Sequence, residues 1–431
     1  MNTRRDFLKL CGMAGLGFAC PGGLNSILRA APTEAPAYEG PFYMVFNASG
    51  GWDTTYLMDP KGIGETNRLY KEGDILTKGA HKFAPTEKHK DGGMSNEQFF
   101  GEFGSELLTL NGLDYSVNNH GPGSRYMATG KLDSLEYPTF AALVAAAKGP
   151  TCPVSFLTFG NYSATGNLVA MSRVPYLHSL QKLANADGVE GNARSAYHDD
   201  FALARIERAL EEKRKARSEL PLLPRQARAE NMLYAAQVNS KAMQRITPLI
   251  PKDVPKERLM QQAEIALVSF AAGVCVSANL SIGQFDSHAN NDRDQMKLIP
   301  EFLAGIAYVI RRAEELKIRN KLVIVIQSEM GRTPNYNKGD GKDHWSIGSI
   351  MFMGAGIKGN RVIGATDGGQ FLIPINAQTL AAEPDKNKAL RVRPEHIHQA
   401  LREFAGIADH PYSKKYPLLI PEKERLAGLW G

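Results

Sequence analysis

Acidic and histidine side chains follow three apolar stretches of the chain that have the character of buried strands. In chain order they are Asp53 after "FYMVFNA", Asp286 and His288 after "GVCVSANLSI", Glu329 after "KLVIVI", and Asp343 and His344 one loop further on. Ligands of open α/β sheets gather beyond the carboxyl ends of the strands. Acids that converge there repel each other unless protons, hydrogen bonds or a cation compensate them. The pattern therefore predicts a metal site at one edge of a sheet.

The donor types restrict the metal. Carboxylate oxygen and imidazole nitrogen suit Zn²⁺, Mn²⁺ or iron, and the absence of cysteine ligands argues against a closed structural zinc site. We therefore expect one or two divalent ions, with zinc preferred and manganese, iron or calcium as alternatives. Each residue alone also has a simpler interpretation, since Asp53 could cap a helix and His344 could lie on the surface. Only the repetition at successive strand ends favours a metal.

The elements that must position these residues alternate along the chain. Besides the three apolar stretches, the sequence predicts strands at "PVSFLTFG" and "SIMFMGAG", and helices near 136–148, 256–272 and 296–317 and at "RPEHIHQALREFAGI". Continuous apolar strands separated by helices predict a mostly parallel sheet covered on both faces. The expected fold is therefore an α/β/α sandwich of three layers. Residues 60–105, which are polar and show no sustained period, are expected to form a surface excursion.

Residues 197–245 differ in composition from the rest. They are helical in pattern, highly charged and interrupted by Pro221 and Pro224. We interpret them as a helical hairpin inserted into the sheet domain. It would act either as a lid or as a solvated helix pair, because charged runs of this kind usually form wet helix faces.

The N-terminus has the pattern of a targeting segment. Arg4 and Arg5 precede "DFLKL" and a short apolar run rich in glycine and alanine, which is too weak to span a bilayer stably. Residues 1–31 resemble a twin-arginine signal peptide, which implies passage through the twin-arginine translocase and a periplasmic or secreted protein. Cys20 would allow a lipid anchor, although the preceding "GFA" fits that signal poorly. We expect no membrane span after the signal.

Charge and cysteine content exclude other classes. Residues 1–31 contain four basic residues and one acidic residue, so the rest of the chain holds about 47 basic and about 44 acidic residues. This weak balance argues against a nucleic-acid partner, which usually shows a clustered basic excess. Outside the signal, only Cys152 and Cys275 are present. They could form a disulfide, but two buried thiols are the more common arrangement for a distant pair.

Four ordered motifs, "GGWD", "FDSH", "SEMGRTP" and "GKDHW", resemble those of the family catalogued as domain of unknown function 1501. That family is grouped with the alkaline phosphatase and sulfatase superfamily. The resemblance implies an alkaline phosphatase-like α/β/α sandwich over residues 32–431, with one or two metals at the strand ends. It also implies metal-ligand roles for Asp53, Asp286, His288, Glu329 and His344, with Asp343 as a ligand or as the partner of one.

The stretch "NNHGPGSRYMATGKL" resembles the sulfatase signature Cys-x-Pro-Ser-Arg followed by Thr-Gly. The position of the sulfatase nucleophile falls on Gly121, which has no side chain, so the usual covalent mechanism is not expected. His120 stands next to it and could serve as ligand, base or nucleophile, and Ser124 is a weaker alternative. The simpler interpretation is a glycine-rich turn that caps the following helix.

Three cationic side chains near these motifs could neutralise charge on a phosphoryl or sulfuryl group: Arg125, Lys131 and Arg332. Arginine is the better bidentate partner of such groups. Arg332 follows Glu329 by three residues and could equally hold that carboxylate. Both roles of Arg332 stay open at this point.

The sequence thus predicts an exported, metal-dependent, hydrolase-like protein that acts on a small anionic substrate, a phosphate or sulfate ester. The alternative is a non-catalytic, metal-binding surface or assembly protein on the same scaffold, with a partner in the cell envelope. The missing nucleophile at Gly121 favours this alternative, whereas the retained candidate ligands favour the enzyme.

Overall fold

The computed structural model describes residues 36–185, 188–189, 192–218 and 239–431. Its centre is a sheet of eight strands in the order β14-β4-β13-β10-β1-β9-β5-β6. In that order the strands are Arg361–Ile363, Leu108–Asp114, Ile347–Gly354, Leu322–Gln327, Phe42–Ala48, Ser277–Ile282, Phe156–Thr158 and Met171–Ser172. Within this sheet β13 alone runs antiparallel to its neighbours, β10 and β4, and the other pairings are parallel. The predicted mostly parallel sheet is confirmed.

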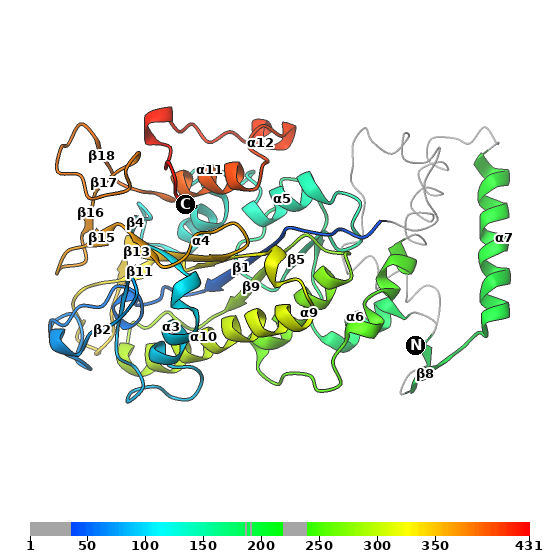
Figure 1. The fold of residues 1–431 in the computed structure, drawn as a ribbon, viewed down its shortest axis with the longest axis horizontal. Coiled ribbons are helices and arrows are strands. Elements are labelled where there is room, and N and C mark those ends of the chain that lie inside the picture. Colours follow the sequence, from blue (N-terminus) through cyan, green and yellow to red (C-terminus); the bar gives the residue numbers. More distant parts are fainter. Residues whose placement is uncertain (1–35, 186–187, 190–191, 219–238) are drawn as a thin grey trace.

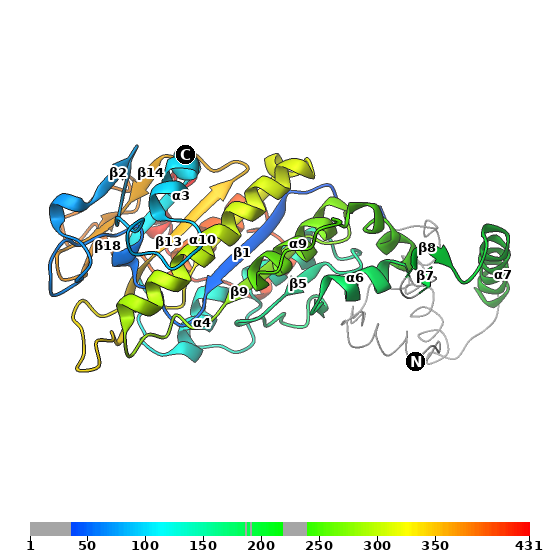
Figure 2. The ribbon, with the colours of Figure 1, turned by 90° about the horizontal axis from the view of Figure 1, so that it is seen from below.

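Helices cover both faces of the sheet (Figure 1). On one side lie α3 (Asn96–Phe103), α6 (Leu177–Ala184), α9 (Arg258–Ala271) and α10 (Asn291–Glu315). On the other lie α4 (His120–Thr129), α5 (Phe140–Lys148), α11 (Pro394–Phe404) and α12 (Pro411–Lys415). The predicted three-layer sandwich is therefore confirmed. Helix α7 (Asp200–Ser218) stands apart at one end of the molecule in both views (Figures 1 and 2).

Five two-stranded sheets lie outside the central sheet. They are β2 with β3 (Leu76–Lys78, His81–Phe83), β7 with β8 (Gly188–Val189, Asn192–Ala196), β11 with β12 (Gly331–Arg332, His344–Trp345), β15 with β16 (Ala365–Thr366, Leu372–Ile373) and β17 with β18 (Ile375–Asn376, Ala389–Leu390). The pair of β11 and β12 sets Arg332 opposite His344, two residues of the predicted site.

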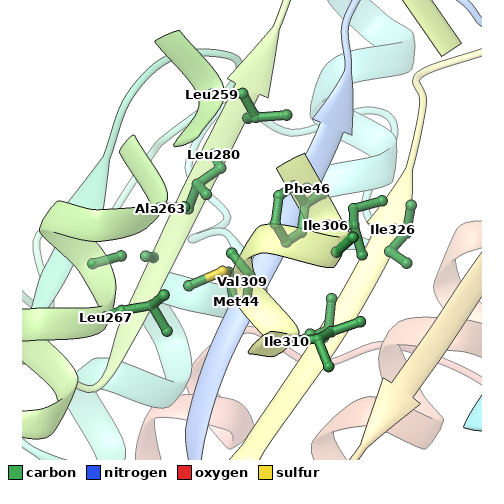
Figure 3. Packing of buried hydrophobic residues seen from close by; sticks show 14 of the residues in the cluster. Met44, Phe46, Leu259, Ala263, Leu267, Leu280, Ile306, Val309, Ile310 and Ile326 are labelled. Atoms are coloured by element: carbon green, nitrogen blue, oxygen red, sulfur yellow. The ribbon is translucent and has the colours of Figure 1, made fainter. Parts of the chain in front are cut away.

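The sequence periods explain how the layers pack. Side chains of a strand alternate between the two faces of a sheet, so Met44 and Phe46 of β1 face α9 and α10 while Tyr43 and Val45 face the opposite layer. On the helices the matching residues recur at intervals of three or four. Figure 3 shows the contact, which includes Leu259, Ala263 and Leu267 of α9 and Ile306, Val309 and Ile310 of α10. This packing fixes the strand ends that carry the predicted site residues.

One expectation for the region of residues 60–105 is wrong. Residues 96–103 form α3, and its aromatic side chains Phe99, Phe100 and Phe103 are buried in the core. Ser95 and Gln98 form a capping box at its start, which satisfies two of the free amides there. Because α3 has only eight residues and polar loops flank it, the hydrophobic pattern averaged over residues 60–105 shows no helical period.

Other predictions on individual segments have mixed outcomes. Helix α7 lies within the predicted insertion, but residues 219–238, which include Pro221 and Pro224, lie outside the described residues, as do the predicted signal peptide and Cys20. Cys152 and Cys275 are both free and buried, as the simpler interpretation predicts. In the described part of the chain, no helix combines the length and the apolar character that a membrane crossing needs.

A buried histidine ties α11 to α4. His398 Nε2 donates to the carbonyl oxygen of Met127 at 2.9 Å. Burial, aided by the charge of Arg402, lowers the pKa of His398 from 6.5 to about 4, although the bond to Met127 opposes this shift. Because the unfolded histidine takes up a proton more readily, the stabilising contribution of neutral His398 is complete above pH 6.5 and is lost as the pH falls toward 4.

We therefore expect His398→Gln to flatten the acid limb of stability, since glutamine can donate to Met127 without titrating. The wild type should lose about 2 kcal/mol more than the variant between neutral pH and pH 5. Urea unfolding at the two pH values measures this difference. Identical pH dependence in both proteins would contradict the buried, neutral state of His398.

Candidate metal centre

Five strands deliver side chains to one edge of the sheet. The carboxyl ends of β9, β1 and β10 lie in register there, with Ala48 paired to Ile282 and Asn47 paired to Gln327. Strand β4 runs parallel to them and leads to Asn118 and His120. The antiparallel β13 begins at this edge with Ile347, shortly after His344 of β12. Residues far apart in sequence therefore meet, as the pattern of strand ends predicts.

The turn after β1 depends on glycine. Gly50 has φ +120°, and a Cβ there would lie 2.4 Å from the backbone nitrogen of Asp286. Only glycine tolerates this conformation and this approach. The Gly50 amide then donates to Glu329 Oε1 at 2.7 Å. The "GG" of the first motif thus joins the loops after β1, β9 and β10.

Asp286 is the centre of the cluster. Its Oδ1 lies 3.1 Å from His288 Nε2 and 3.2 Å from His344 Nε2, and its Oδ2 lies 3.3 Å from His120 Nε2. Burial would raise its pKa, but the hydrogen bond and charge of Arg332, together with the histidines, outweigh that effect and hold the pKa at about 2. Asp286 is therefore a carboxylate at neutral pH, surrounded by three imidazole nitrogens.

The other nitrogen of each imidazole is held by an acceptor. His344 Nδ1 lies 2.8 Å from the Asn118 carbonyl oxygen, which can only accept, so Nδ1 carries the proton. His288 Nδ1 lies 2.8 Å from Asp343 Oδ1, and this hydrogen bond is the largest cause of the lowered pKa of Asp343. An ionised Asp343 likewise accepts, which leaves the His288 Nε2 lone pair directed toward Asp286.

His120 follows the same pattern. Its Nδ1 lies 3.0 Å from Glu329 Oε1, and this bond raises the pKa of His120, with a further rise from the charge of Asp286 and an opposing effect of burial. In the neutral form His120 therefore turns its Nε2 lone pair to Asp286. The second oxygen of Glu329, Oε2, is buried and has no hydrogen-bond partner among the described residues.

The donor set fits a divalent cation. Neutral imidazole Nε2 atoms that face one carboxylate repel it through their lone pairs, so the arrangement requires protons or a metal ion between them. One ligand atom each of His120, Asp286 and His344 lies within 4.8 Å of the others, and His288 Nε2 lies 3.0 Å from His344 Nε2. Metal-bound histidines characteristically donate their other N–H to a carboxylate or a backbone carbonyl, as all three do here.

Asp53 lies outside this cluster. Its side chain is fully buried, caps the turn at Thr54–Tyr56 and forms an ion pair with Lys342 at 2.7 Å. Sequence patterns alone missed Lys342, although it stands in the conspicuous motif "GKDHW" directly before Asp343. The lysine next to Asp343 in this motif could have indicated that one of the predicted acidic ligands is neutralised by a positively charged side chain and not by a metal.

Two of the predicted catalytic arginines are engaged in structural contacts. Arg332 is buried and donates from Nε to the Gly51 carbonyl at 2.8 Å and from Nη2 to Asp286 Oδ1 at 2.7 Å. It therefore holds Asp286 and not Glu329. Arg125, on α4, donates from Nε to the Leu132 carbonyl at 2.8 Å and, among the described residues, makes no hydrogen bond to the cluster. Lys131 pairs with Asp133 at 3.1 Å.

The segment that resembles the sulfatase signature forms a helix. Asn119 accepts a hydrogen bond from Gly121 N and so caps α4, which runs from His120 to Thr129. The expectation of a turn before the helix is wrong, because the glycines lie inside the helix. Gly123 is needed there, since a Cβ would lie 2.7 Å from the Glu329 carbonyl oxygen. His120 at the first position of the helix is thus placed directly over Glu329.

The site is open to solvent on one side. The side chains of His288, Asp286 and His120 are 47%, 42% and 38% exposed, whereas Glu329 is 3% exposed. The acceptor behind His120, Glu329, is therefore enclosed, whereas Asn118, whose carbonyl lies behind His344, is exposed. The face of the cluster formed by Asp286 and His288 is thus reachable from solvent.

Comparisons with solved structures give distant likenesses. Ps i-CgsB has a TM-score of 0.41 and 8% identity, covering 91% of this chain and 75% of that one. The PsFucS1 sulfatase from Pseudoalteromonas sp. has a TM-score of 0.37 and 10% identity, covering 99% and 74%. The PH0037 protein from Pyrococcus horikoshii has a TM-score of 0.34 and 11% identity, covering 86% and 98%. Similarity at this level carries no conclusion about function.

Sequence comparison is more specific. No curated protein matches the chain. A family model described as "Protein of unknown function (DUF1501)" matches residues 44–382, a span that contains the site residues from Asp53 to His344. Since this match covers most of the chain, the protein belongs to the DUF1501 family.

Proposed function

We propose that the protein is an exported, divalent-metal-dependent hydrolase of phosphate or sulfate esters. One observation carries the proposal: three imidazole Nε2 atoms surround the Asp286 carboxylate while their Nδ1 atoms are held by Glu329, Asp343 and the Asn118 carbonyl. The grouping of the DUF1501 family, which the four sequence motifs resemble, with the alkaline phosphatase and sulfatase superfamily supports the ester class. The arginine pair Arg4-Arg5 supports export to the periplasm or beyond.

The ligands in this proposal are Asp286, His120, His288 and His344. A divalent cation held by them would polarise an ester oxygen and activate water for attack. Zinc suits three imidazoles and one carboxylate, and manganese and iron are alternatives. Glu329 and Asp343 orient His120 and His288 and do not act as ligands.

In this proposal the bound cation, and not an arginine side chain, would bind the anionic ester. Arg332 is buried, and its nitrogens are engaged by protein oxygens, so it positions Asp286 and does not contact the substrate. His288, whose Nδ1 is held by Asp343, is the most exposed of the three histidines, so it would hold the cation from the solvent side. Water is the expected nucleophile, because Gly121 offers no side chain.

The experiment supplies zinc, manganese, iron or calcium to chelator-stripped protein and measures release of p-nitrophenol from its phosphate and sulfate esters. We expect turnover that requires the metal and falls by at least about 100-fold in His344→Ala, as expected when a ligand is removed. Asp133→Asn, an exposed acid paired with Lys131, is the matched control and should stay active.

The second candidate is a non-catalytic metal-binding protein of the cell envelope, which Gly121 favours. It predicts tight metal binding, abolished in His344→Ala, without hydrolysis of either ester. That combination would contradict the enzyme and leave the metal centre intact.

A further inference from the structure

Besides Arg332, a second buried cation, Lys342, lies at the edge of the sheet that carries the candidate metal centre. Lys342 Nζ lies 2.7 Å from Asp53 Oδ2 and donates to the Thr66 carbonyl at 2.6 Å. The rings of Tyr56 and Tyr336 face the ammonium group, with centroids at 5.5 and 5.2 Å. Both side chains of the ion pair are fully buried. The cation is therefore enclosed by a carboxylate, a carbonyl and two aromatic faces.

Asp53 has no acceptor capacity left for a metal. Its Oδ1 accepts from Thr55 N at 3.1 Å and from Thr55 Oγ1 at 2.6 Å, and its Oδ2 accepts from Asn291 Nδ2 at 3.0 Å as well as from Lys342. An ionised carboxylate offers about four lone-pair sites, and all are used. A metal ion could bind Asp53 only by displacing the lysine.

The backbone of Lys342 belongs to the frame of the metal centre. Its amide donates to the Ser287 carbonyl at 3.0 Å, between Asp286 and His288, and its carbonyl accepts from Arg332 Nη1 at 3.0 Å. Lys342 is thus fixed from both ends, so its ammonium group is a permanent part of the site and not a mobile surface charge.

The charges at this edge balance with one divalent ion. Four carboxylates contact the histidines, Arg332 or Lys342, namely Asp53, Asp286, Glu329 and Asp343, while the half-buried Asp292 accepts from the hydroxyls of Tyr56 and Tyr336 instead. Two buried cations, Lys342 and Arg332, pair with Asp53 and Asp286. The remaining two negative charges match one divalent cation when the imidazoles are neutral, and the buried, unpartnered Glu329 Oε2 is consistent with such a missing charge. A second divalent ion would leave an excess positive charge in a partly buried site, which is costly.

We infer that the centre binds a single divalent cation, and that the Lys342 ammonium group neutralises Asp53 where a second ion would otherwise be needed. This inference rests on the proposed metal-dependent function and specifies its stoichiometry. It also explains why Asp53 follows a strand at the metal edge without joining the ligands.

The test is the number of zinc ions per chain, by elemental analysis after equilibration with Zn²⁺ and removal of free metal. We expect about one ion in the wild type, and still about one in Asp53→Asn and in the double variant Asp53→Asn/Lys342→Met, because neither residue is a ligand. Lys342→Met alone leaves Asp53 buried without its cation, so we expect a second, weaker site and about two ions.

The outcomes separate the two proposals. Two ions in the wild type, with one lost in Asp53→Asn, would overturn the role of Lys342 but leave the metal-dependent function standing. No ion in folded wild-type protein would overturn the metal function itself. If Lys342→Met does not fold, the double variant decides, because loss of its single ion would also contradict the inference.

Discussion

Asp286→Asn is expected to weaken divalent-metal binding by more than about 100-fold, because even the partners behind a ligand typically contribute 10–100-fold. Asparagine keeps the shape of the side chain but removes the charge that His120, His288 and His344 surround. Since the pKa of Asp286 is held at about 2, the wild-type group is fully ionised at neutral pH, and the substitution removes a whole charge. Ester hydrolysis should fall with metal occupancy.

Competition with a chromophoric chelator measures this loss. Asp133→Asn is the matched control, an exposed carboxylate whose partner is Lys131, and its affinity for metal should equal that of the wild type. Unchanged affinity in Asp286→Asn would mean that the cluster of histidines does not hold the metal.

Arg332→Met is expected to lower the free energy of unfolding by about 3–5 kcal/mol, mainly because several buried carbonyl acceptors lose their donor. The guanidinium group donates to the carbonyls of Gly50, Gly51 and Lys342 and to Asp286. Methionine fills similar space but leaves buried carbonyl acceptors without donors, and each such acceptor costs about 1–3 kcal/mol.

Denaturant unfolding of Arg332→Met and Arg311→Met gives the comparison. Arg311 is exposed and pairs with Glu102 at the surface, so its replacement should cost less than about 1 kcal/mol. Equal effects of the two substitutions would show that Arg332 does not tie the loops together. A catalytic role without a structural one would instead lower turnover at unchanged stability.

Much of the fold follows from the local pattern of apolar residues. The strand that begins at Leu322 is a continuous apolar run, and α9 and α10 carry apolar residues at helical intervals. The mostly parallel sheet and its helical layers can therefore be predicted from the sequence. Helix α3 could not, because its signal is a single turn of buried phenylalanines within a long polar region. Nor could the helical state of the segment from His120, whose glycines and proline favour a turn.

The sequence predicts most members of the site but not their roles, and it wrongly includes Asp53 and misses Lys342. Strand ends place Asp286, His288 and His344 at one edge, as the sequence predicts. The pairing of Asp53 with Lys342 joins residues 289 positions apart. The choice between ligand and partner for Glu329 and Asp343 depends on which imidazole nitrogen each one faces. Such contacts arise from tertiary packing, which neither spacing nor composition encodes.

The most direct test of the metal centre is anomalous X-ray diffraction from crystals of zinc-loaded protein, collected on both sides of the zinc absorption edge. The account predicts one strong anomalous peak at about 2.0–2.2 Å from the Nε2 atoms of the ligating histidines and from an oxygen of Asp286. Well-ordered density for these side chains without such a peak, in crystals soaked with excess zinc, would contradict it.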